Sequence, residues 1–258
     1  HGRLVAIRKD PSFDWSDIVV VTAEDIPGRN TIFLMEEDQP ALVAVGSRIM
    51  HPSEALALVA APTQARANAA LAHLHIEVEA LPAVFSPEEA MKAEVKLYGD
   101  DNIFKSFLIE KGDTSALEDI FKSCHLVVEG EYRTQAQEQM YIEPQGMISS
   151  WTDDTHCRIT GSMQCPFYVQ KAMRVLLGID DAHLIVEQAV TGGGFGGKEE
   201  YPSMIAGHCA LLAKKAGVPV KLIYERDEDI EATTKRHPSV VKHKMGFDKD
   251  GRIQAIDV

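Results

Sequence analysis

The most unusual part of the sequence is "TGGGFGGKEE", residues 191–200. Five of six consecutive positions in it are glycine, and a lysine and two glutamates follow. A strand-like run, "AHLIVEQAV" (residues 182–190), precedes it, and a run with helical spacing, "PSMIAGHCALLAKKAG" (residues 202–217), follows it. A glycine-rich turn between a strand and a helix directs backbone N–H groups and the positive end of the helix toward one place. The stretch therefore predicts a binding site for a bulky anion, of which phosphate and pyrophosphate esters are the commonest.

Two nucleotide-binding motifs almost fit this stretch. As G-x-x-x-x-G-K, residues 192–198 match a phosphate-binding P-loop, but Glu199 stands where that loop needs the serine or threonine that ligates magnesium. As G-x-G-x-x-G, residues 192–197 match a dinucleotide fingerprint, and Glu225 near the end of the following strand could bind a ribose. The second pattern keeps open an NAD- or FAD-dependent oxidoreductase domain. A turn that serves only tight packing is the purely structural alternative, although five glycines lose considerable chain entropy on folding.

The composition is that of an ordinary globular protein. The chain has 258 residues, of which 45% are hydrophobic and 25% charged, enough for one large domain or two ordinary ones. Its net charge is −13 and no basic block alternates with aromatic residues, so we expect no nucleic-acid partner. No apolar run approaches the roughly 20 residues of a membrane span, and no signal peptide is recognisable. We therefore expect a cytoplasmic protein.

The cysteines and histidines show no metal-ligand spacing. The four cysteines lack a Cys-x-x-Cys pair, so the chain is expected to carry no iron–sulfur or zinc site of its own. Single histidines at positions 51, 125, 183 and 208 are interpreted as structural. Because the chain begins at His1 inside one strand-like run and stops inside another, "GRIQAIDV" (residues 251–258), we also expect a piece of a longer protein.

Two kinds of pattern divide the chain. In residues 1–85, short apolar runs alternate with a stretch that has helical spacing. An edge strand and a turn end this region, and a helix capped at Ser86 follows. The apolar runs are "RLVAI" (3–7), "DIVVVTA" (17–23) and "ALVAVGS" (41–47), and the helical run is "PTQARANAALAHL" (62–74). Residues 86–113 are interpreted as a linker. From residue 114 the chain shows strands with stronger alternation, and then a helix from Pro166 to Gly178.

A second motif turns these observations into a resemblance. "SMQCP", residues 162–166, fits the pattern G/S-x-Q-x-P and precedes "GGGFGGKE" by about thirty residues. Together they resemble the molybdopterin-binding subunit of the xanthine dehydrogenase and aldehyde oxidase family, the molybdenum hydroxylases. Residues 1–85 are similar to the α/β hammerhead domain of that family. The resemblance implies an α+β fold: a hammerhead-like domain (1–85), a linker (86–113) and the first part of a mixed α+β molybdopterin-binding domain (114–258).

The resemblance also implies which residues form the site. In the family the main chain of the glycine loop lies against the cofactor, which corresponds here to Gly194, Phe195, Gly196 and Gly197. Phe195 and Gly196 would lie near molybdenum, and no side chain of this chain would bind the metal directly. Gln164 matches a glutamine that hydrogen-bonds an oxo ligand of the metal, so it is assigned both a cofactor-binding and a catalytic role.

Three further positions are less specific. Glu199 matches a substrate-facing glutamate of the xanthine-oxidising members and is assigned a catalytic role, with a helix N-terminal glutamate as an equal alternative. Glu143, in "EQMYIEP" (residues 138–144), corresponds to a stretch near the substrate funnel, but an ordinary strand glutamate is favoured. Arg236 and His237 are interpreted as structural.

The function implied by the resemblance is hydroxylation of an aldehyde or a purine-like N-heterocycle, with water as the source of oxygen. The implied cofactor is molybdopterin, either plain or as its cytosine dinucleotide, and iron–sulfur clusters and FAD would lie on other parts or subunits. The general-base glutamate and an arginine for the substrate lie further along the family's subunit than residue 258. We therefore expect the chain to need the remaining molybdopterin-binding part and to be inactive alone. A non-catalytic assembly module of a larger complex remains the second alternative.

Overall fold

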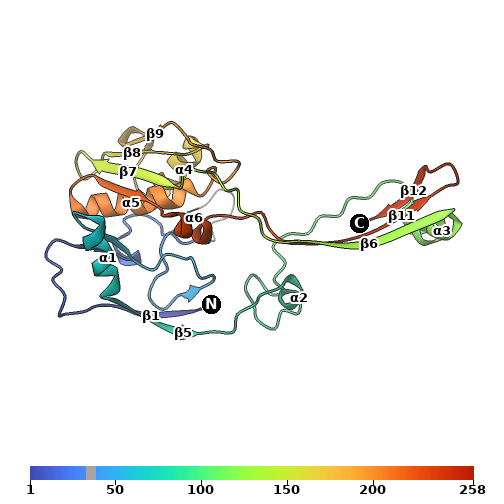
Figure 1. Ribbon diagram of the computed structural model, residues 1–258, viewed down its shortest axis with the longest axis horizontal. Coiled ribbons are helices and arrows are strands. Elements are labelled where there is room, and N and C mark those ends of the chain that lie inside the picture. The colour runs from blue at the N-terminus through green and yellow to red at the C-terminus, as the bar shows by residue number, and fades with distance from the viewer. Residues whose placement is uncertain (33–38) are drawn as a thin grey trace. The chain divides into compact units, whose positions relative to one another are not determined.

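The computed structural model describes residues 1–32 and 39–258 and divides them into two compact units (Figure 1). Unit 1 comprises residues 1–85 and 139–234, and unit 2 comprises residues 86–138 and 235–258. Each unit therefore combines segments that are far apart in the sequence. Both motifs of the sequence analysis, "SMQCP" and the glycine loop, lie in unit 1.

A mixed sheet forms the frame of unit 1. Its strands run in the order β10-β7-β8-β9, and only β8 and β9 among these neighbours are parallel. The strands are β7 (Gly146–Trp151), β8 (Cys157–Gly161), β9 (Leu184–Gln188) and β10 (Val220–Ile223). Helix α4 (Pro166–Leu177) and the short η3 (Asp181–His183) connect the parallel pair, and α5 (Pro202–Ala216) connects β9 to β10.

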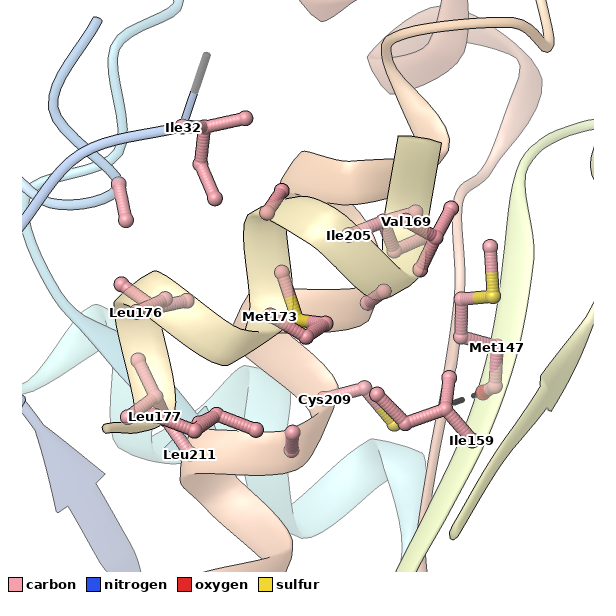
Figure 2. Close-up of a cluster of buried hydrophobic side chains, with 14 of the residues drawn as sticks. Ile32, Met147, Ile159, Val169, Met173, Leu176, Leu177, Ile205, Cys209 and Leu211 are labelled. Atoms are coloured by element: carbon pink, nitrogen blue, oxygen red, sulfur yellow. Dashed lines mark hydrogen bonds between the residues drawn. The ribbon is translucent and has the colours of Figure 1, made fainter. Parts of the chain in front are cut away.

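Helices α4 and α5 pack together and against this sheet to form the main core (Figure 2). The side chains of Val169 and Met173 on α4 and Ile205 on α5 are completely buried, as are those of Cys209 and Ile159. Burial of each large aliphatic side chain contributes about 1.5–3 kcal/mol to stability. Both runs in which the sequence predicts a helix therefore form helices, and α5 is buried along most of its length.

The ends of α4 and α5 follow the predicted signals. Each helix has proline at its first position and a left-handed glycine at its end, Gly178 with φ 65° and Gly217 with φ 68°. The last turn of α4 is completed from the N-terminal segment, because Gly28 N donates to Leu176 O at 3.0 Å and Arg29 N to Val175 O at 2.9 Å. No side chain fits at Gly28, since a Cβ there would collide with the carbonyl oxygen of Val175.

The N-terminal segment adds an antiparallel sheet in the order β3-β1-β5 and a separate β2–β4 pair. Its elements are β1 (Gly2–Lys9), β2 (Val19–Val21), η1 (Ala23–Asp25), β3 (Arg48–Ile49), β4 (Leu58–Ala60), α1 (Gln64–Ala72) and β5 (Leu74–Ala80). The apolar run at residues 41–47 forms no strand. The amide of Asn30 binds the main chain of Ala41 and Leu42 in place of a neighbouring strand, which lets this buried segment remain a loop.

Unit 2 holds an antiparallel sheet in the order β12-β11-β6. Its elements are α2 (Pro87–Ala90), η2 (Thr114–Ala116), α3 (Leu117–Ser123), β6 (Leu126–Thr134), β11 (Ser239–Phe247) and β12 (Ile253–Asp257). Ser86 caps α2 as predicted, by accepting a hydrogen bond from Glu89 N at 3.2 Å. Helix α3 was not predicted from the sequence, and it buries Phe121 against this sheet. In the part of the chain that the structure describes, no helix combines the length and apolarity of a membrane span.

Candidate functional site

The glycine loop, residues 191–198, leaves β9 in a tight turn with unusual backbone angles. Gly193 and Gly196 have φ values of 98° and 91°, a region that is almost closed to other residues. Phe195 also has a positive φ, 49°, and its side chain is 76% exposed. A bulky residue in this region is a genuine outlier, and such residues gather at ligand sites.

Other glycines of the loop are required because neighbouring side chains lie against them. A Cβ at Gly192 would lie 2.7 Å from Glu143 Cβ, and a Cβ at Gly197 would lie 2.5 Å from Tyr141 Cε1. At Gly194 it would collide with the Gln164 amide. Internal packing therefore requires part of the motif, in addition to the close ligand approach that the sequence suggested.

Gln164 lies directly against the loop, just before α4. Its side-chain oxygen, Oε1, accepts hydrogen bonds from the N–H groups of Gly196 at 3.0 Å and Lys198 at 3.1 Å. Its own N–H donates to Lys198 O at 2.6 Å. Because both side-chain contacts come from donors, the orientation of the amide is determined. The amide nitrogen Nε2 has no acceptor among residues 1–32 and 39–258.

The N–H groups of the loop divide into used and available ones. Gly192 N donates to Glu143 Oε2 at 2.7 Å, and Gly197 N donates to Gly194 O at 2.7 Å. The N–H groups of Gly193, Gly194 and Phe195 donate to no described residue. These consecutive donors, at a position with no side chain on two of the three residues, suit a bulky anionic ligand.

Behind the loop, Lys198 points into the protein. Its side chain is completely buried, and Nζ lies 2.8 Å from Glu143 Oε2, 3.0 Å from Ser162 Oγ and 4.7 Å from the centroid of the Tyr141 ring. A P-loop lysine would face the ligand instead. The P-loop interpretation therefore fails at Lys198 as well as at Glu199.

Glu143 forms an ion pair with Lys198, a role that the sequence did not predict. It lies in the loop before β7 rather than in a strand, so the favoured interpretation as a strand glutamate is wrong. Its Oε2 accepts from Lys198 Nζ, from Ser162 Oγ at 2.6 Å and from Gly192 N. Burial raises the pKa of Glu143, but these hydrogen bonds outweigh it and lower the pKa to about 2.

A second buried group holds the other end of the loop. Asp229, on α6 (Arg226–Ala232), accepts from Tyr141 Oη at 2.8 Å and from Gln145 N at 2.6 Å. Gln145 Nε2 then donates to Tyr141 Oη and to Gly197 O, both at 2.9 Å. Burial and the hydrogen bond to Asp229 raise the pKa of Tyr141. No sequence motif marked Asp229 or Gln145, because they are joined to Tyr141 only in the folded chain.

The remaining predicted residues take different places. Glu199 is half-buried and has no hydrogen-bond partner within the described ranges. It lies three residues before α5 begins at Pro202, so it is outside the first turn of that helix. Arg236 binds Gln135 O at 2.7 Å and supports the structural interpretation. His208 is buried against Ala41 O at 2.8 Å, and burial lowers its pKa. Among the described residues, no group of three or more His, Cys, Asp or Glu side chains could hold a metal ion.

The topology disagrees with a dinucleotide-binding fold. In that fold the strand after the glycine-loop helix is parallel to the first strand and belongs to the same run of parallel strands. Here β10 runs in the same direction as β9 but lies at the opposite edge of the sheet. Its neighbour there is the antiparallel β7, so β9 and β10 do not belong to one run of parallel strands. Glu225 is the N-cap residue of α6 rather than a residue at a strand end. The NAD or FAD alternative is therefore not favoured.

Comparisons with known proteins agree with the geometry. The family model for the molybdopterin cofactor-binding domain matches residues 98–258, more than half of the chain. The large molybdopterin subunit of nicotinate dehydrogenase from Eubacterium barkeri is 34% identical over 261 aligned positions, which cover 100% of this chain and 60% of that subunit. Mouse aldehyde oxidase 2 is 32% identical over 261 positions, covering 100% of this chain and 18% of the oxidase.

A solved structure shows the same arrangement of the chain. The aldehyde oxidoreductase of Desulfovibrio desulfuricans ATCC 27774 superimposes with a TM-score of 0.87 at 25% identity, over 99% of this chain and 29% of that enzyme. The chain thus spans less than two thirds of the length of each of these relatives.

Proposed function

Because the chain belongs to the molybdopterin cofactor-binding domain family of the molybdenum hydroxylases, we propose that it supplies cofactor-contacting loops to an enzyme that oxidises an aldehyde or an N-heterocycle. The resemblance noted in the sequence is thereby confirmed at the level of the family. The oxygen added to the substrate would come from water. The names of the relatives support both substrate classes, since one acts on nicotinate, an N-heterocycle, and another is an aldehyde oxidase.

The observation that carries the proposal is the row of available N–H groups at Gly193, Gly194 and Phe195. Molybdopterin is bulky and anionic, because it carries a dithiolene and a phosphate, and backbone N–H groups can hold it without a bulky side chain intervening at the two glycines. Phe195 adds an exposed apolar wall beside them. Gly196 and Gly197 shape this turn, although their own N–H groups are already used within the protein. When bound, the cofactor supplies the redox chemistry.

Gln164 would bind the cofactor from beside the glycine turn, because its amide lies directly against the loop. Its Oε1 is held by the loop, so Nε2 is the atom left to donate a hydrogen bond to an oxygen of the ligand. An amide donor does this without adding charge. Glu199 would face the substrate. Its carboxylate is half-buried and accepts no hydrogen bond from any described residue, so it is available to a ligand.

The finer assignments of the sequence analysis belong to the same proposal. Residues 1–85 would form the hammerhead-like part, residues 86–113 a linker, and residues 114–258 the first part of the molybdopterin-binding domain. The match of the family model to residues 98–258 supports the last assignment. Iron–sulfur and flavin groups on other domains or subunits would carry the electrons away, in the cytoplasm.

The test uses the complete enzyme that contains this chain. We expect it to hold molybdenum and to place oxygen from isotopically labelled water into an aldehyde or N-heterocyclic product. We expect Gln164→Leu to lower kcat by about tenfold or more, the effect of about 1.4 kcal/mol of lost stabilisation. Gln170→Leu, on α4 close after Gln164 and without a described side-chain hydrogen bond, is the matched control. Label arriving from dioxygen, or absence of molybdenum, would overturn the proposal. Unchanged turnover in both Gln164→Leu and Glu199→Gln would favour the non-catalytic assembly module instead.

A further inference from the structure

We propose that Lys198 is the positioning residue of the site: its buried ammonium holds Glu143 in place as a clamp on Gly192 N–H and thereby fixes the row of available N–H groups in the glycine loop. The inference rests on the proposed function for the identity of the ligand. The geometry of the clamp belongs to the chain itself and can be tested without a ligand.

Lys198 joins the two sequence motifs. Through its backbone it is bound twice to Gln164, since its N–H donates to Gln164 Oε1 and its carbonyl accepts from Gln164 N. Through its side chain it donates to Ser162 Oγ at 3.0 Å. Both partners belong to "SMQCP". Lys198, in the glycine loop, therefore contacts two residues of "SMQCP", although the two motifs are separated along the chain.

The direction of the side chain gives Lys198 its role. The ammonium lies 2.8 Å from Glu143 Oε2, on the buried side of the loop, and has 0% exposure. An ammonium in such a place requires a counter-ion and hydrogen-bond acceptors, because an unpaired buried charge is strongly destabilising. Glu143 and Ser162 supply them. Lys198 therefore does not contact the ligand, and it acts through the atoms that do.

Glu143 transmits this order to the beginning of the loop. A single oxygen, Oε2, receives three donors, from Lys198, Ser162 and Gly192. Charge-assisted hydrogen bonds of this kind are shorter and stronger than neutral ones. Gly192 is the residue immediately before the available N–H groups, so fixing its N–H fixes where those groups start. A Cβ at Gly192 would displace Glu143, which explains why the clamped residue is glycine.

Backbone hydrogen exchange in the complete enzyme tests the clamp, with and without cofactor. In Lys198→Met, which keeps the length of the side chain and removes its charge, we expect exchange of the hydrogen-bonded loop amides to accelerate about tenfold, the factor for a change of about 1.4 kcal/mol. These are the amides of Gly192, Gly196, Gly197 and Lys198. Molybdenum content should fall in the same variant. Lys221→Met, which alters an exposed lysine on β10 in the same unit, is the matched control.

Two further variants keep the inference falsifiable if Lys198→Met does not fold. Glu143→Gln preserves shape and removes the charge of the clamp, and we expect the same acceleration. In the pair Lys198→Met with Glu143→Met, the second change should add little to the first, because both residues act as one unit. Unchanged exchange of the hydrogen-bonded loop amides in Glu143→Gln, or equal acceleration in Lys221→Met, would overturn the inference. If exchange accelerates in Lys198→Met but the unaltered complete enzyme holds no molybdopterin, the inference is supported and the proposed function is contradicted.

Discussion

The two ends of the glycine loop are held in different ways. At Gly192 the anchor is ionic and partly open to water, since the Glu143 side chain is 42% exposed although its Lys198 partner is not. At Gly197 the anchor is closed, since Asp229 and Gln145 are completely buried and the loop contributes only a carbonyl oxygen to it. The closed anchor therefore belongs to the core and should control stability. The open anchor should control where the loop lies and how it responds to pH.

Breaking the closed anchor should have the largest effect. In Asp229→Ala, the hydroxyl of Tyr141 and the N–H of Gln145 lose a buried charged acceptor. We expect the free energy of unfolding in urea to fall by about 3 kcal/mol. Asp227→Ala, at an exposed position of the same helix, should change it by less than about 0.5 kcal/mol. Equal losses in the two variants would show that the anchor adds no stability.

Adding a side chain to the loop between its two anchors should have the next largest effect on stability. In Gly194→Ala the new methyl group meets the Gln164 amide, and one of the two must move. We expect the free energy of unfolding to fall by about 2 kcal/mol, as in other overpacked sites. Molybdenum content, measured by elemental analysis, should fall too. Gly146→Ala is the control, since its Cβ would make an ordinary 3.4 Å contact with Ile223 Cγ1. A normal cofactor content in Gly194→Ala would contradict the proposed place of the ligand.

Acid should weaken the ionic anchor at Gly192. The pKa of Glu143 is lowered from 4.5 to about 2, so its contribution to stability is complete above pH 4.5 and is lost as the pH falls toward 2. Because the side chain is 42% exposed, solvent screening limits this contribution to about 1 kcal/mol. Urea unfolding at a series of pH values should show the loss in the unaltered protein. The same series on Glu143→Gln should show a smaller loss, and parallel curves would contradict the ionic anchor.

Glu199 belongs to neither anchor, so its replacement should have the smallest effect on stability. We expect Glu199→Gln to change the free energy of unfolding by less than about 0.5 kcal/mol. In the complete enzyme, kcat/KM for an N-heterocycle should fall by about tenfold, the effect of losing one hydrogen bond of about 1.4 kcal/mol in the transition state. An aldehyde without a ring nitrogen should be less affected. A large loss of stability without a kinetic change would place Glu199 in the fold rather than the site.

The parts of the fold that the sequence predicted are those with local causes. Helices α4 and α5 combine apolar spacing with proline at one end and glycine at the other, and each signal acts within a few residues. The run at 41–47 has the apolar character of a strand, but the side chain of Asn30 satisfies its main chain. These hydrogen bonds, which take the place of strand pairing, come from a residue 11 or 12 positions away. The sequence around residues 41–47 therefore gives no sign of them.

The site shows the same limit. Gln164 and the loop were assigned from two motifs, and the structure brings them into hydrogen-bonding contact. The role of Lys198 was missed because nucleotide motifs place such a lysine toward the ligand, whereas burial beside Glu143 turns it inward. Asp229 and Gln145 had no motif at all. They lie on segments 84 residues apart and meet only after the chain has folded.

The cap that Gly28 and Arg29 place on α4 has a consequence for the order of folding. Gln164 lies just before the first turn of α4. The last turn of α4 is capped by residues 28 and 29, which leave the ribosome long before the helix is synthesised. Closing a contact over such a separation costs chain entropy and comes late in folding. Residues 28 and 29 therefore lack these two hydrogen bonds until α4 has formed, and we expect proteolysis of a nascent chain to cut near Gly28 until α4 has been synthesised.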